Sequence, residues 1–173
     1  MNKSTGTPNK DTQEAIINSL ITELTCDDVS RCQKARKTLV SIGKPAVVPL
    51  VKALADKKEQ VRWEAAKSLG QIADPTAITA LLEILEDKDF DIRWLAAEGL
   101  IAIGKNGLVP LLETLIKRSD SVWFRNGAHH ILSDLARKGF YSILRPVLVA
   151  LEGPEPSIEV PLAGEIALKK LVE

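Results

Sequence analysis

Few side chains in this 173-residue sequence could carry chemistry. The two histidines, His129 and His130, are adjacent. Neighbouring residues on a helix point about 100° apart, so this pair cannot grip one metal ion together. Cys26 and Cys32 lack the second pair of ligands that a zinc site needs. There is no glycine-rich phosphate loop, nucleophile elbow or paired-carboxylate motif. We therefore expect no catalytic residue, no metal and no cofactor.

Tryptophan is the residue type that points to binding instead of catalysis. The chain has three Trp, three Phe and one Tyr, so nearly half of its few aromatic residues, which make up only 4% of the sequence, are Trp. Trp63 and Trp94 each follow an arginine. Because Trp and Arg dominate the energetics of many protein interfaces, their role depends on which face of their structural elements they occupy.

These elements form an internal repeat. The segment VRWEAAKSLGQI at residues 61–72 recurs as IRWLAAEGLIAI at 92–103 and, more diverged, as FRNGAHHILSDL at 124–135, with further copies at 31–42 and 160–171. The segments between them place apolar residues at i, i+3, i+4 and i+7, as in Val47, Leu50, Val51 and Leu54, which is typical of an amphipathic helix. No stretch alternates with period two. The sequence therefore predicts an all-α fold of about five helix pairs, each a helix A followed by a helix B.

Turn residues set the predicted boundaries. Gly43 and Gly104 lie just past a helix, where a left-handed residue is needed, and Asp74 precedes Pro75 as a helix start. Stacked helix pairs bury apolar faces that an isolated pair leaves exposed, giving an α-α superhelix (solenoid). We predict a flexible N-terminal tail at 1–10 and one domain at 11–173, with repeats at approximately 11–43, 44–73, 74–104, 105–138 and 139–173.

The repeated segments resemble a known family. VRWEAAKSLGQIADPTAITALLEIL and IRWLAAEGLIAIGKNGLVPLLETL are similar to HEAT repeats, specifically the short HEAT-like repeats first associated with phycobilin lyases. The resemblance covers residues 12–173. It implies an armadillo-like solenoid whose B helices line the concave surface, and it extends to scaffolds, lyase subunits and a few enzymes.

The family also uses a ladder in which an Asp of the A–B turn contacts the Arg that begins helix B. In this sequence the resemblance assigns the ladder to Asp56 with Arg62, Asp87 with Arg93, and Arg125. The expected role is to satisfy turn amides and hold the stacking register. Ser119 stands at the Asp position for Arg125, with Asp120 beside it.

The helix-B residues opposite the apolar arc would form the inner wall. In the second repeat these are Trp63, Glu64, Lys67 and Gln71; in the last they are Leu162, Ala163, Ile166 and Lys170. The predicted partner-binding residues of this face are Trp63, Lys67, Gln71, Trp94, Glu98, Trp123, Asn126 and His130. Two interpretations of the tryptophans stay open. Each Trp either seals an inter-repeat seam or belongs to a ridge that binds a partner.

The predicted function is a non-enzymatic scaffold that binds a protein or peptide partner through its concave B-helix surface. The alternative is a subunit or relative of a phycobilin lyase, which would present a tetrapyrrole or its acceptor protein. Deoxyhypusine hydroxylase, another HEAT-like protein, carries a di-iron site resembling R-H-E-A-A, but Trp63 and Trp94 occupy its His position here. HEAT-like DNA glycosylases need a basic groove. The predicted wall instead balances lysines against Glu64, Glu98 and Asp134, so nucleic acid is not expected.

Composition agrees with a folded soluble protein. The 23 basic and 23 acidic residues cancel, which disfavours a nucleic-acid arm or an acidic tail. No apolar run approaches the roughly 20 residues of a membrane span, and no signal-peptide core follows Met1. We expect a cytoplasmic protein.

Overall fold

The computed structural model describes residues 10–25 and 28–172, and this part of the chain is helical and contains no strand. The all-α solenoid prediction is therefore confirmed. The predicted tail at 1–10 lies outside the described residues except for Lys10, which begins the first helix.

Helices follow one another in pairs joined by short turns. The first pair is α1 (Lys10–Glu23) and α2 (Val29–Ile42), and the second is α3 (Lys44–Ala53) and α4 (Glu59–Ile72). The third joins α5 (Ile78–Glu83), flanked by short 3₁₀ turns at Pro75–Ala77 and Ile84–Glu86, to α6 (Phe90–Ile103). A turn at Gly104–Gly107 leads to α7 (Leu108–Lys117) and α8 (Val122–Leu135). A π-helical turn at Ala136–Phe140 leads to α9 (Tyr141–Glu152) and α10 (Pro156–Val172).

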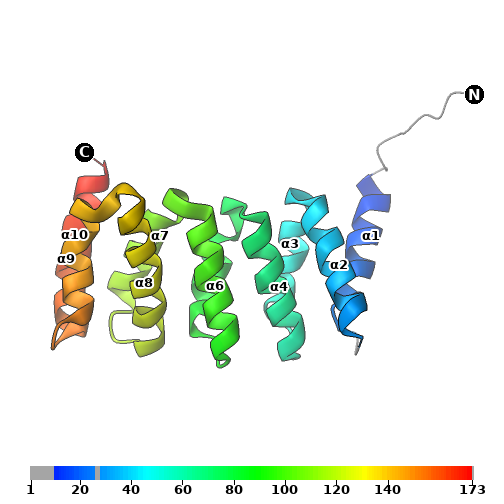
Figure 1. Cartoon of the computed structure of the whole chain (residues 1–173), viewed down its shortest axis with the longest axis horizontal. Coiled ribbons are helices and arrows are strands. Elements are labelled where there is room, and N and C mark those ends of the chain that lie inside the picture. The colour runs from blue at the N-terminus through cyan, green and yellow to red at the C-terminus, as the bar shows by residue number, and fades with distance from the viewer. Residues whose placement is uncertain (1–9, 26–27, 173) are drawn as a thin grey trace, which may run out of the picture.

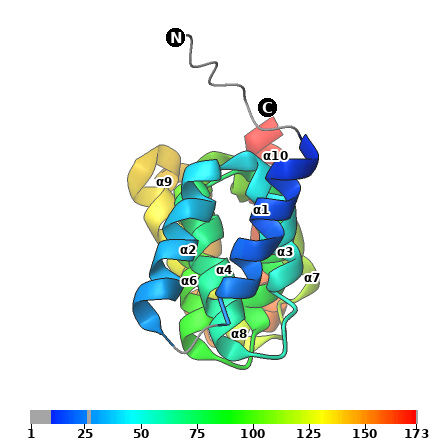
Figure 2. The ribbon, with the colours of Figure 1, turned by 90° about the vertical axis from the view of Figure 1, so that its right-hand side faces the viewer.

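The pairs stack side by side along the long axis of the molecule (Figure 1). Helices α2, α4, α6 and α8 pack on one another in sequence and form one layer, called here the B layer. Helices α1, α3, α5 and α7 form the opposite A layer (Figure 2). Each B helix thus presents one side to its A partner and leaves the other on the surface.

The last pair departs from this order. Helix α9 packs beside α8, whereas α10 packs against α7 and α9. In Figure 2, α9 lies on the side of α2 and α6, and α10 lies on the side of α3 and α7. The connection to the next helix is one residue after α2, five residues after α4, four after α6 and five after α8. The connection after α8 differs in shape, because it is a π-helical turn with Gly139 at φ 112°, and α9 then lies alongside α8 instead of crossing to the A layer.

This exchange corrects part of the sequence interpretation. Leu162, Ala163, Ile166 and Lys170 belong to α10 and do not extend the wall of the B layer. The periodicity of the segment was assigned correctly as a helix. Its layer was assigned wrongly, because the layer depends on the connector and not on the pattern.

The predicted turn residues mark the helix boundaries, the glycines through their backbone and Asp74 through its side chain. Gly43 and Gly104 adopt φ 72° and 73°, which side chains with a Cβ rarely adopt. Asp74 caps the next turn by accepting a hydrogen bond from the Thr76 N–H at 2.9 Å. These caps fix where each helix begins, and so which residues fall on its buried face.

The core is the contact surface between the two layers. Val61, Ala65 and Leu69 are buried as predicted, while Ile72 is half-buried at the end of α4. Their counterparts and the leucines of the A helices form one cluster that runs from Ile17 to Ala167. Stacking therefore supplies the burial that one helix pair lacks.

One segment is apolar enough by length and composition to cross a membrane, namely Phe90–Lys117. It does not form one helix. Gly104 breaks it into α6 and α7, and both halves bury leucines in the core. The solenoid core therefore accounts for its hydrophobicity.

Candidate aromatic binding pocket between two B helices

Two capped helix starts position the aromatic residues of the B layer. Asp89 accepts a hydrogen bond from the Asp91 N–H at 2.9 Å and begins α6. Ser121 accepts one from the Phe124 N–H at 3.2 Å and begins α8. Trp94 and Trp123 therefore lie near the starts of two neighbouring helices, at the same end of the layer.

A cavity of about 230 Å³ lies between these helices, here called the α6–α8 pocket. Trp94 is 46% exposed and Trp123 is 47% exposed at its rim. The lining residues are Phe90, Arg93, Trp94, Ala97, Trp123, Asn126, Gly127 and His130. Four residues predicted from the sequence, Trp94, Trp123, Asn126 and His130, thus come together around one cavity.

The wall of the pocket contributed by Trp94 is held in place by stacking. The Trp94 indole lies 4.4 Å from the His130 ring, centroid to centroid, at 26° between planes, and Phe90 stacks at 6.5 Å on Trp94. The His130 Nε2 is 2.8 Å from Glu98 Oε1. Glu98 therefore orients His130, which in turn limits the motion of Trp94.

Arg93 forms the opposite rim together with Trp123. Its guanidinium carbon lies 4.6 Å from the centre of the Trp123 ring and 5.6 Å from that of Phe90. Its Nη1 donates a 2.6 Å hydrogen bond to the main-chain carbonyl of Asp87. The pocket therefore combines apolar ring surface with one cation.

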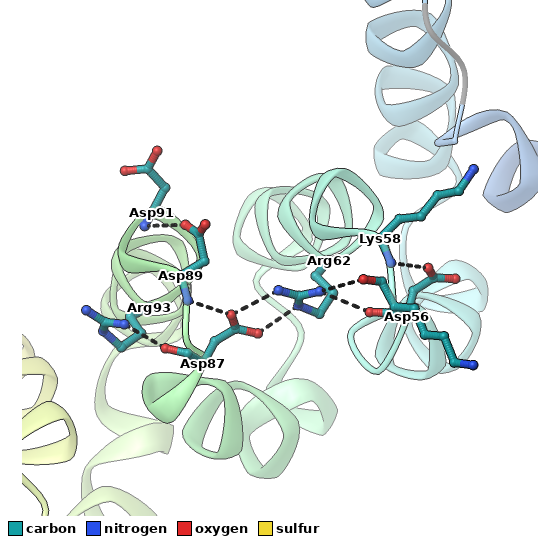
Figure 3. A network of polar contacts seen from close by, with 8 residues as sticks. Asp56, Lys58, Arg62, Asp87, Asp89, Asp91 and Arg93 are labelled. Atoms are coloured by element: carbon teal, nitrogen blue, oxygen red, sulfur yellow. Dashed lines mark hydrogen bonds and ion pairs between the residues drawn. The ribbon is translucent and has the colours of Figure 1, made fainter.

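The turns that precede α4 and α6 carry the arginine ladder (Figure 3). Arg62 donates from Nη1 to the Asp56 carbonyl at 3.1 Å, so the two residues touch through the main chain. Its Nε and Nη2 donate to the Asp87 carboxylate of the next repeat at 2.8 and 3.2 Å. The contact between arginine and carboxylate thus joins consecutive repeats. The sequence instead predicts that each arginine contacts the Asp of its own turn.

Burial and pairing act in opposite directions on Asp87. Burial pushes the pKa of Asp87 upward, but hydrogen bonds from Arg62 and from the Asp89 N–H outweigh it and hold the pKa below its ordinary value. The Asp56 carboxylate instead accepts from the Lys58 N–H at 2.8 Å. Arg125 donates to the Ser119 carbonyl at 2.5 Å.

The remaining predicted surface residues lie outside the pocket. Trp63 is half-buried and covered by the Lys67 ammonium, which is 4.3 Å from the ring centre. Gln71 accepts a 3.1 Å hydrogen bond from Arg36. The structure therefore separates Trp63, Lys67 and Gln71 from the site that contains Trp94 and Trp123.

One wall assignment was wrong. Glu64 was placed on the free face, but it is buried between α2 and α4, where its Oε2 lies 2.8 Å from Arg36 Nε. Helix α2 packs closely enough on α4 to cover this position. The arginine partner comes from another repeat, so angular arithmetic on a single helix could not show the pair.

Sequence reasoning also missed Phe90 as part of the pocket. Phe90 is the first residue of α6 and lies four positions before Trp94, the spacing at which helix side chains meet. That spacing was the available signal. The other histidine, His129, lies with its Nε2 2.9 Å from Glu152 Oε1. Among residues 10–25 and 28–172, no three His, Cys, Asp or Glu side chains converge as metal ligands would.

Comparison with known proteins assigns the class of this solenoid. A family model for HEAT repeats matches two overlapping segments, residues 17–100 and 47–133. Together they span more than half of the chain, and the chain belongs to the HEAT-repeat family. No match was found among curated proteins.

Several solved structures are similar to this chain. The complex of CpcE and CpcF of phycocyanin lyase from Nostoc sp. PCC7120 is 20% identical, with 98% of this chain and 69% of that chain covered and a TM-score of 0.50. An engineered protein is 22% identical, with 87% and 77% covered and a TM-score of 0.46. A designed armadillo repeat protein in complex with the peptide (KR)4 is 19% identical, with 90% and 91% covered and a TM-score of 0.43. At these identities the likeness concerns the fold alone.

Proposed function

We propose that this HEAT-repeat protein is a non-enzymatic scaffold that binds a protein segment on its B layer, with the α6–α8 pocket as the centre of the interface. The observation that supports this most is the pair of half-exposed tryptophans at the rim of one cavity. Contiguous exposed apolar patches mark interaction sites, and Trp and Arg are both enriched among interface hot spots.

The pocket is organised before any partner arrives. Phe90, Trp94 and His130 are already stacked, and Glu98 holds His130. When a partner inserts a side chain beside Trp94, these rings therefore lose less conformational entropy than mobile rings would. Ala97 and Gly127 form part of the lining with little side-chain bulk.

The size of the pocket separates the two candidate functions. Pockets that enclose drug-sized ligands measure about 300–1,000 Å³, and this one measures about 230 Å³. It fits one or two side chains of a protein segment better than a whole tetrapyrrole. At this pocket the size favours the scaffold over the second candidate, a relative of phycobilin lyase subunits; a larger cavity of about 650 Å³ lies between α1 and α3.

A binding comparison tests the scaffold proposal. Immobilised wild-type chain and a Trp94→Ala/Trp123→Ala variant are incubated with extract of the source cells, and retained proteins are quantified by mass spectrometry. We expect a protein that the wild type retains, that the variant loses, and that a Tyr141→Ala variant keeps, since Tyr141 is 59% exposed on α9 outside the pocket. Its direct binding is then measured with purified components. Equal retention by all three chains contradicts the proposal.

Two further measurements test the enzyme and lyase alternatives. We expect elemental analysis of the purified protein to show no stoichiometric iron or zinc. We also expect a free bilin to keep its absorption spectrum when the protein is added. A spectral shift that the Trp94→Ala change abolishes would favour the tetrapyrrole function.

A further inference from the structure

Arg62 and Arg93 occupy equivalent positions in consecutive repeats but have different partners. Each donates from Nη1 to the main-chain carbonyl of the residue six positions earlier. Arg62 also grips the Asp87 carboxylate of the next turn through Nε and Nη2. For Arg93 the equivalent position in the next turn is Ser119, whose hydroxyl donates to the Ser157 carbonyl at 3.1 Å.

Arg93 consequently has no carboxylate partner among the described residues. Its guanidinium face lies on the Trp123 ring instead. A planar guanidinium that stacks by its face keeps its N–H edge available for two parallel hydrogen bonds. Arg93 also lines the α6–α8 pocket, so there is room for a partner group beside it.

Three acidic residues near this pocket already have partners. Asp87 is held by Arg62, Asp89 caps α6, and Glu98 contacts His130. Asn126, the remaining polar residue of the lining apart from Arg93 and His130, is uncharged. Among the residues that line the pocket, Arg93 is therefore the one with a permanent positive charge that a partner can contact.

We infer that Arg93 receives the side-chain carboxylate of an Asp in the bound protein segment, while an apolar neighbour of that Asp packs on Trp94 and Trp123. This inference rests on the proposed scaffold function and names the partner chemistry. The turn around Asp87 serves as the template, because there an internal Asp both accepts from its own turn, the Asp89 N–H, and binds an arginine of the same register. The Asp of the partner thus supplies the carboxylate that the next turn of the chain does not offer to Arg93.

The test is a selection of 12-residue peptides displayed on phage against the full chain. The best peptide is then synthesised with both ends blocked, which removes terminal charges, and its Kd is measured by fluorescence polarisation. We expect the selected peptides to share an Asp beside an apolar residue. Replacing that Asp with Asn should weaken binding to the wild type by about tenfold or more, as for a charge-assisted bidentate contact.

Variants of the chain locate the contact. Against Arg93→Gln the Asp and Asn peptides should bind within about twofold of each other, because the interaction that distinguishes them is gone. Arg93→Lys keeps the charge but lacks the planar fork, and it should also weaken the Asp peptide. Arg125→Gln removes the equivalent guanidinium one repeat later, outside the pocket, and should bind as the wild type does. Thermal melts verify that each variant is folded.

The outcomes separate this inference from the proposed function. Selected peptides that are basic or lack an acid, or an equal loss from Asp→Asn on wild type and Arg93→Gln, overturn the carboxylate inference. If those peptides still require Trp94 and Trp123, the scaffold proposal stands. Peptides that bind independently of both tryptophans contradict the scaffold proposal, and a selection without any binder contradicts both.

Discussion

The three tryptophans differ in environment although they derive from the same repeat surface. Trp94 and Trp123 are nearly half exposed at the pocket, whereas Trp63 is half-buried beneath Lys67. We expect Trp94→Ala and Trp123→Ala to lower the free energy of unfolding by about 1 kcal/mol or less. Trp63→Ala should lower it by roughly 2 kcal/mol, below the 3–5 kcal/mol of a fully buried Trp. Thermal or urea melts measure the difference, and losses near 3 kcal/mol at Trp94 would identify it as a seam residue.

The Arg62–Asp87 pair is the part of the ladder with the greatest consequence for stability. Both side chains are nearly buried, at 8% and 10% exposure, so removing one partner leaves the other without compensation. We expect Asp87→Asn to lower the free energy of unfolding at pH 7 by about 3 kcal/mol. Asp56→Asn is the matched control, since its carboxylate accepts only from its own turn, and it should stay within about 0.5 kcal/mol.

The same pair gives a pH dependence with a defined sign. The pKa of Asp87 is lower in the folded chain than its ordinary value of about 3.9. Its contribution to stability is therefore complete above about pH 5 and is lost as pH falls through the unfolded and then the folded pKa. We expect the difference between the wild type and Asp87→Asn to be constant from pH 7 to 5 and to shrink below pH 4 in urea melts. A difference that shrinks already near pH 6 would assign it to another group.

At the scale of elements, two glycines set the closest approach between B helices. A Cβ on Gly70 would lie 3.2 Å from the Cα of Gly99, so α4 and α6 touch backbone to backbone. The neighbouring atom belongs to a packed helix and cannot rotate away. This approach brings Arg62 at the start of α4 within reach of the turn before α6.

Overpacking at Gly70→Ala should cost about 1–3 kcal/mol, against roughly 1 kcal/mol that Ala gains over Gly in a helix, so we expect net destabilisation of up to about 2 kcal/mol. Gly107→Ala is the control. Its added Cβ would meet Leu100 at 3.8 Å, an ordinary contact, and its φ is negative. That variant should be neutral or more stable by about 0.5 kcal/mol. If Gly70→Ala is the stabilising change in chemical melts, the close approach is not what limits the packing.

At the scale of the whole molecule, the exchange of α9 and α10 closes the repeat array. Gly164 of α10 lies against Ile116 of α7, and a Cβ there would come within 2.8 Å of its side chain. Ile158, Leu162 and Ile166 remain exposed on α10. The end of the solenoid therefore differs in surface from the B layer that contains the pocket.

The exchanged position of α10 can be tested by substitution. Gly164→Leu should destabilise the protein by about 1–3 kcal/mol because it overpacks the contact with α7. Glu165→Leu changes the adjacent exposed residue and should stay within about 0.5 kcal/mol. Equal effects in thermal melts would contradict the packing of α10 on α7.

The sequence by itself determined the helices, their pairing and the buried face. Each of these depends on local chemistry: apolar spacing in VRWEAAKSLGQI, a left-handed position at Gly43 and Gly104, and the cap at Asp74. It also singled out Trp94, Trp123, Asn126 and His130, since they lie on the same face of successive helices. The tertiary structure alone decided that Glu64 is buried against Arg36, that Trp63 lies apart from the pocket, and that Arg62 binds the Asp of the following repeat. These outcomes depend on how closely neighbouring repeats approach and on the connector at Ala136–Phe140, distances and directions that the period of a single helix does not contain.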